Sequence, residues 1–138
     1  MPLMEGAALR GRSAADMRVR RESLGLTQVW VADQLGVQDR AIRRWEAGDR
    51  EIPEDVWIVL DRAEAAAYEI LWETIRGIRS EVVDIEVYDS YDDFYEAWDM
   101  KPYPPSFHRA AVAKIPLMVD GDIRFHYPHR AASIDSSE

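Results

Sequence analysis

The chain has 138 residues, 47% of them apolar, which is enough to bury one or two small cores. It has no cysteine, which excludes disulfide bonds and thiolate metal sites, and it shows neither an apolar run long enough to span a bilayer nor a signal peptide. These features predict a soluble cytoplasmic protein with no membrane partner.

The formal net charge of −9 is unevenly distributed along the chain. Residues 10–50 contain nine Arg and six acidic side chains, a balance of +3, whereas residues 51–100 contain three basic and fifteen acidic side chains, a balance of −12. A locally basic surface can bind nucleic acid even when the rest of the protein is acidic. The first third of the chain is therefore the candidate for such a surface.

The two ends of the chain, residues 1–12 and 129–138, show no periodicity, and we expect them to be flexible tails. After the first tail, Ser13 is a suitable cap for a helix that runs to about Leu24. Gly25 is expected to end this helix.

Two short helices joined by a tight turn are predicted next. Thr27 can cap the first of them, and Gly36 ends it with the left-handed residue that a tight turn requires. The second helix is expected from about Gln38 to Ala47, with apolar side chains on one face and polar side chains on the other. This arrangement describes a helix-turn-helix.

The same stretch carries the pattern T-Q-x-x-x-A-x-x-L-G-V-x-x-x-x-I-x-x-W-E-x-G, and with it resembles the Cro/C1-type helix-turn-helix regulators, also called the XRE family. The resemblance implies a lambda-repressor-like helical DNA-binding domain over residues 13–67. It also implies an ion pair between Glu46 and either Arg18 or Arg21. Ten residues match in register: Thr27, Gln28, Ala32, Leu35, Gly36, Val37, Ile42, Trp45, Glu46 and Gly48.

In such a domain the second helix enters the major groove of double-stranded DNA. Arg43 is the best candidate for guanine, because its fork matches the O6 and N7 acceptors. Asp39 is expected either to accept from cytosine or to orient Arg40 or Arg43, and Arg44 either to bind phosphate or to pair with an acid. The predicted base-reading residues are Gln38, Asp39, Arg40 and Arg43, and the predicted phosphate-binding residues are Thr27, Gln28, Arg44 and Arg50.

A long helix over residues 54–79 is predicted after Pro53, which suits the first turn of a helix. Its apolar side chains lie on more than one side, so more than one neighbour must cover it. The small N-terminal domain covers only its start. The helix therefore bridges to a second domain, residues 68–128.

The second domain is predicted to be a small α+β unit. Val83 to Val87 and Ile123 to Tyr127 alternate in polarity like strands. A short helix begins after Ser90, and residues 106–114 indicate another. The fold class is thus mainly α, with a long connecting helix and a two-strand, two-helix C-terminal unit.

This layout is similar to that of the anti-CRISPR-associated autorepressors. In those relatives the C-terminal unit dimerises the protein, and some members also bind their own messenger RNA, so the resemblance implies a homodimer and RNA as a further partner. The apolar side chains available for a dimer interface, or for the core of each protomer, are Leu71, Trp72, Ile75, Phe94, Trp98, Phe107 and Phe125.

The sequence favours a DNA-binding repressor, acting on its own operon through an inverted-repeat operator. The alternative is an antitoxin-type repressor, whose acidic and aromatic C-terminal unit binds and neutralises a partner protein. The chain lacks a Gly-rich phosphate loop and a nucleophile elbow, so it is not predicted to be an enzyme. We predict no metal and no cofactor.

Overall fold

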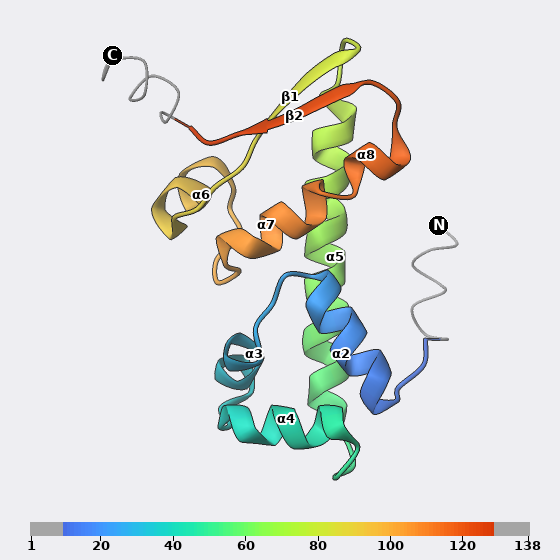
Figure 1. Ribbon diagram of the computed structural model, residues 1–138. Coiled ribbons are helices and arrows are strands. Elements are labelled where there is room, and N and C mark those ends of the chain that lie inside the picture. The colour runs from blue at the N-terminus through green and yellow to red at the C-terminus, as the bar shows by residue number, and fades with distance from the viewer. Residues whose placement is uncertain (1–9, 129–138) are drawn as a thin grey trace, which may run out of the picture. The chain divides into compact units, whose positions relative to one another are not determined.

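The computed structural model describes residues 10–128 and is mainly helical, with one small sheet in its C-terminal part (Figure 1). This confirms the predicted fold class. The chain divides into two compact units between Ala65 and Ala66. Within residues 10–128 no helix has the length and apolarity needed to cross a membrane.

The N-terminal unit consists of three short helices and the first part of a long one. The first helix begins with a reciprocal pair of bonds: the Ser13 hydroxyl accepts from the backbone N–H of Asp16, and the Asp16 carboxylate accepts from the backbone N–H of Ser13. The long helix stops three residues earlier than predicted, immediately before Gly77. The helices are α2 (Ala14–Ser23), α3 (Gln28–Leu35), α4 (Asp39–Ala47) and α5 (Glu54–Arg76).

One apolar core joins these helices. Each helix contributes side chains that are almost fully buried, as the 3.6-residue period requires. On α4 only Ile42 is almost fully buried, whereas Ala41 and Trp45 are half-buried. The core side chains include Met17, Leu26, Val31, Ile42, Val56 and Leu60.

Arginines outside this core bind the acidic side of α5. Arg20 Nη2 lies 2.7 Å from both Asp61 Oδ1 and Glu64 Oε1, and the Arg20 side chain is only 11% exposed. Arg12, which the sequence assigns to the tail, lies 2.7 Å from Glu54. These ion pairs attach α2 and the residues before it to α5.

The C-terminal unit holds the end of α5, three further helices and a two-stranded sheet. The strands are parallel and in register from Val82 opposite Asp122 to Glu86 opposite His126. Parallel strands require a crossover connection, and the three helices supply it. The shortest of them was not predicted. The elements are β1 (Val82–Glu86), α6 (Tyr91–Ala97), α7 (Pro105–Val112), α8 (Ile115–Met118) and β2 (Asp122–His126).

The apolar side chains offered for a dimer interface or a protomer core differ in burial. Phe94 and Phe107 are completely buried within the protomer. Leu71 is also buried, at 7% exposure. Trp72 and Phe125 are exposed by 37% and 43%, and they remain available to a partner.

Candidate nucleic-acid interface

The turn between α3 and α4 has the backbone geometry that its sequence predicts. The Thr27 hydroxyl caps α3 by accepting from the backbone N–H of Trp30 at 3.0 Å. Gly36 ends α3 in the left-handed region, with φ of 68°. The next N–H, that of Val37, donates back to the carbonyl of Ala32 at 3.0 Å. Local chemistry therefore fixes both ends of α3 and the start of the turn.

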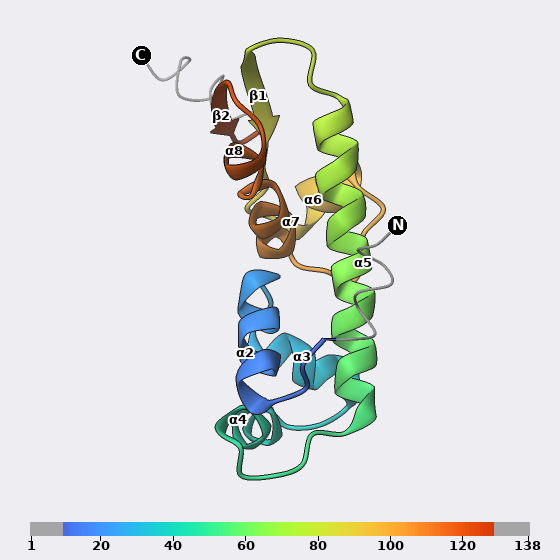
Figure 2. The same cartoon turned by 90° about the vertical axis from the view of Figure 1, so that its right-hand side faces the viewer.

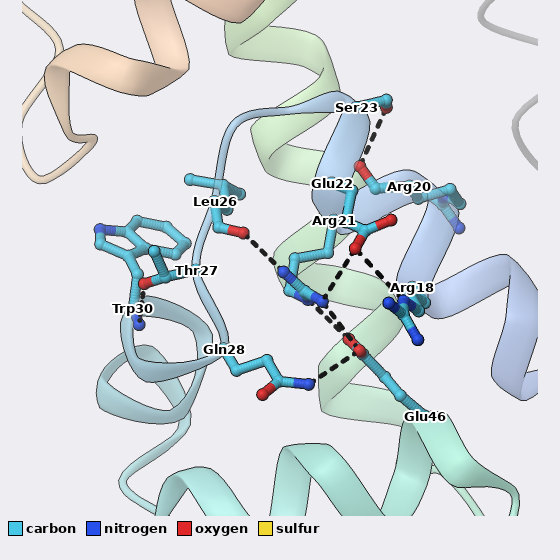
Figure 3. Close-up of polar contacts among 10 residues, drawn as sticks. All are labelled: Arg18, Arg20, Arg21, Glu22, Ser23, Leu26, Thr27, Gln28, Trp30 and Glu46. Carbon is cyan, nitrogen blue, oxygen red and sulfur yellow. Dashed lines mark hydrogen bonds and ion pairs between the residues drawn. The ribbon is translucent and has the colours of Figure 1, made fainter.

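A buried ion pair joins the first helix to α4 (Figure 3). Arg21 donates to both carboxylate oxygens of Glu46, at 2.7 and 2.9 Å, and to the carbonyl of Leu26 at 2.9 Å. Gln28 donates its side-chain amide to the same carboxylate at 3.1 Å. The bond with Glu46 raises the pKa of Arg21 despite the opposing effect of burial. The predicted pair is thus confirmed with Arg21, while Arg18 pairs within its own helix.

The exposed face of α4 carries the four residues predicted to read bases. Gln38 is the N-cap residue, but its side chain makes no capping bond. Arg40 and Arg43 are exposed. Arg43 Nη1 donates to Asp39 Oδ2 at 2.7 Å, so Asp39 holds Arg43 one turn along the helix. This contact is the one that the orienting role of Asp39 requires, and both roles foreseen for Asp39 stay predictions.

Beside this face lies a shallow hollow of about 270 Å³. Three of its lining residues are arginines, and none is acidic. In the described part of the chain, Arg40, Arg44 and Arg50 form no ion pair, so no acid partner for Arg44 is present there. A basic hollow without a carboxylate suits an anionic group such as phosphate. Its lining comprises Gln38, Arg40, Ala41, Arg44, Trp45 and Arg50.

Two of the predicted phosphate-binding residues already have a role inside the domain. The hydroxyl of Thr27 caps α3, and the amide of Gln28 is bonded to Glu46. The sequence analysis missed this use of Gln28 and the place of Trp45 in the hollow. The bond between Gln28 and Glu46 could have been predicted, because both residues belong to the matched sequence pattern.

Residues 17–63 match the helix-turn-helix family model. This segment is similar to the Cro/C1-type helix-turn-helix domains. Proteins with such domains are DNA-binding regulators, and the match supports a DNA-binding function in transcription regulation for this chain. No curated protein matched the chain. The match ends at residue 63, so the similarity of the C-terminal unit to the anti-CRISPR-associated autorepressors stays a prediction.

Proposed function

We propose that the protein is a homodimeric transcriptional repressor of its own operon that binds an inverted-repeat operator. The observation that carries this proposal is the exposed, arginine-rich face of α4 in a helix-turn-helix domain. In this fold the N-terminal part of the recognition helix meets base edges in the major groove.

Base reading is assigned to the exposed face of α4. Arg43 contacts guanine through its fork, and Asp39 sets the direction of that fork. Gln38 and Arg40, at the start of the helix, complete the reading surface. Thr27, Gln28, Arg44 and Arg50 bind phosphates and fix the register, the last two from the basic hollow.

A two-fold arrangement follows from the small size of one reading surface. A single helix-turn-helix contacts only a few base pairs, whereas a dimer reads two half-sites about one helical turn apart. The exposed side chains of the C-terminal unit support a dimer there. In β2 nearly every residue is exposed, and the strand is paired along one edge only. A two-stranded sheet is marginal in water, so a partner copy is expected to cover it.

The test begins with selection of the operator from a random DNA library by the full-length protein. Arg43→Ala and Arg44→Ala are then compared with wild type on the selected site and on random DNA. Arg43→Ala should weaken operator binding by about 1–3 kcal/mol and leave random-sequence binding nearly unchanged. Arg44→Ala should weaken both equally, because a phosphate contact carries no base information.

The matched control is Arg62→Ala, which removes one positive charge from an exposed position on α5, outside the face and the hollow. It should leave the ratio of specific to random affinity unchanged. If Arg43→Ala weakens binding to the operator and to random DNA equally, Arg43 contacts a phosphate and not a base. Failure to select any sequence would overturn the proposed operator recognition.

A further inference from the structure

The C-terminal unit contains a second hollow, of about 440 Å³, that DNA recognition does not use. It is lined by the last turn of α5, the loop that follows it and β1, which succeed one another along the chain (Figure 2). Its volume is within the range of small-molecule sites. Aromatic side chains form part of its lining: Tyr88, Trp98 and His108.

His108 is the unusual member of this lining. It is 1% exposed, yet its Nδ1 atom has no hydrogen-bond partner among the described residues. Leaving a buried polar atom unpaired costs about 1–3 kcal/mol, so such an atom requires an explanation. Burial lowers the pKa of His108 to about 4, so the imidazole is neutral at pH 7. It is therefore uncharged beside any ligand in the hollow.

The charged lining favours a positive ligand. Three carboxylates line the hollow, those of Glu73, Asp84 and Glu86, against the single arginine Arg79. Glu73 is paired with Arg76, and the Glu86 carboxylate accepts from the Tyr88 hydroxyl at 3.2 Å. The Arg79 guanidinium donates to the backbone carbonyls of Arg76 and Ile78, the first at 2.5 Å. Among the described residues the Asp84 side chain forms no hydrogen bond or ion pair, although it interacts electrostatically with Arg124, which lies opposite it in the sheet. The local field is thus negative, and it would repel an anion.

The open edge of β1 adds further acceptors. Val87 N–H and the Glu81 carbonyl bond to β2, and in a parallel ladder every second residue makes such bonds. The alternate residues, which include Asp84 and Glu86, direct their backbone groups to the unpaired edge. All residues from Val82 to Glu86 line the hollow, which therefore runs along that edge. Carbonyl oxygens there can accept from an N–H donor.

We propose that this hollow binds a small organic cation, an ammonium group carried on an apolar or aromatic body. The carboxylates of Asp84 and Glu86 and the backbone carbonyls of β1 accept from the ammonium. The half-buried ring of Trp98 contacts the apolar body and the cation. Tyr88, whose ring packs on Phe94 and His108, holds the Glu86 carboxylate through its hydroxyl. The unpaired Nδ1 of the neutral His108 supplies a further polar contact. This site is independent of the proposed operator recognition, and its test needs no DNA.

The test is a titration of the full-length, isotope-labelled protein, followed by NMR at pH 7. Three probes of similar shape are compared: phenethylamine, the neutral 2-phenylethanol and the anionic 3-phenylpropionate. Phenethylamine should produce saturable shifts at the Trp98 indole and at the His108 ring. The alcohol should bind more weakly, and the acid should not bind. Equal shifts with all three, or none with phenethylamine, would overturn the proposal.

Substitutions in the hollow test whether phenethylamine binds there. Asp84→Asn combined with Glu86→Gln changes two exposed positions and should weaken phenethylamine binding by about tenfold. Asp92→Asn removes the same charge from α6 outside the hollow and should have no effect. Undiminished binding by the double variant would overturn the proposed cation site.

His108→Phe keeps an aromatic ring while removing the unpaired nitrogen. The variant should fold at least as stably as wild type and bind phenethylamine more weakly. Folding is checked on the same sample by its amide spectrum. Unchanged binding by a folded His108→Phe protein would overturn the role of His108 in this site.

Discussion

At the scale of single residues, the contact between Asp39 and Arg43 sets the chemistry of the reading face. A guanidinium held by a carboxylate loses less side-chain entropy when it binds a base, so orientation contributes to discrimination. The same carboxylate repels phosphate and lowers affinity for every DNA sequence. Asp39 therefore favours specificity at the expense of total affinity.

The substitution Asp39→Asn should accordingly raise binding to random DNA and reduce the ratio of operator to random affinity. Both affinities are measured by fluorescence anisotropy at one fixed salt concentration, because the phosphate contribution varies with salt. Asp33→Asn, on the exposed side of α3, is the charge-matched control. An equal gain on both DNAs would show that Asp39 acts through its charge alone.

The buried imidazole of His108 makes stability depend on pH. Burial, with a smaller effect of Arg109, lowers the pKa of His108 from its ordinary value of 6.5 to about 4. Between these values the unfolded chain binds a proton that the folded chain does not, so stability falls as pH falls. Above pH 6.5 the neutral His108 does not reduce the free energy of unfolding. By pH 4 its protonation in the unfolded chain has lowered that free energy by about 3 kcal/mol.

Urea unfolding of wild type and of His108→Phe, each at pH 7 and at pH 4.5, isolates this contribution from that of the many carboxylates. Between pH 7 and pH 4.5 the wild type should lose more free energy of unfolding than His108→Phe, because only the wild type carries the imidazole. Parallel pH profiles would contradict the assignment of a neutral buried imidazole.

At the scale of elements, one carboxylate connects three parts of the DNA-binding domain. Glu46 on α4 accepts from Arg21 on α2 and from Gln28 at the start of α3, and its side chain is only 4% exposed. Without it, Arg21 keeps only the Leu26 carbonyl, at 2.9 Å, and the exposed carboxylate of Glu22, at 3.9 Å. Such losses are far larger than those of surface ion pairs.

Glu46→Ala should therefore destabilise the domain by about 3–5 kcal/mol, as measured by urea unfolding. The comparison is Glu22→Ala, which removes an exposed carboxylate that pairs with Arg18 and lies 3.9 Å from Arg21, and it should change stability by less than about 0.5 kcal/mol. Similar small losses in both variants would show that the pair is hydrated in solution.

Sequence reasoning succeeded where a few neighbouring residues determine the structure. The caps at Ser13 and Thr27 and the left-handed Gly36 follow from local chemistry, and they define α2 and α3. Helix α8 was missed, because four residues containing Pro116 give no readable period. The parallel pairing of β1 with β2 was not foreseen, since alternation shows that a strand exists but not its partner.

Sequence patterns predicted only part of the candidate site. The exposed face of α4 follows from helical periodicity and the matched motif. Periodicity alone did not separate Phe94, which fills the core, from Phe125, which stays exposed, because both are apolar and lie on amphipathic elements. The unpaired nitrogen of His108 depends on packing between distant segments, and no sequence pattern reports it.

At the scale of the whole molecule, the proposed dimer rests on the exposed apolar side chains of the C-terminal unit. Phe125→Glu places a charge on an exposed position of β2 and should convert a dimer into a monomer in sedimentation velocity. Specific operator binding should fall with it, because one domain reads too few base pairs.

Tyr91→Glu is the control, since Tyr91 is an exposed aromatic of the same unit that the predicted interface omits. It should leave the sedimentation of the protein unchanged. A monomeric wild type, or a Phe125→Glu protein that still dimerises, would contradict the dimer model.

The parallel pairing of β1 with β2 also sets an order of events on the ribosome. Domains fold as units, generally beginning with the N-terminal one while synthesis continues. The helix-turn-helix domain is complete once α5 has emerged, but β1 has no partner until β2 has been made, after α6, α7 and α8. A nascent chain thus carries a folded DNA-reading surface before its sheet can close. Any assembly built on β2 consequently takes place only after translation of that strand.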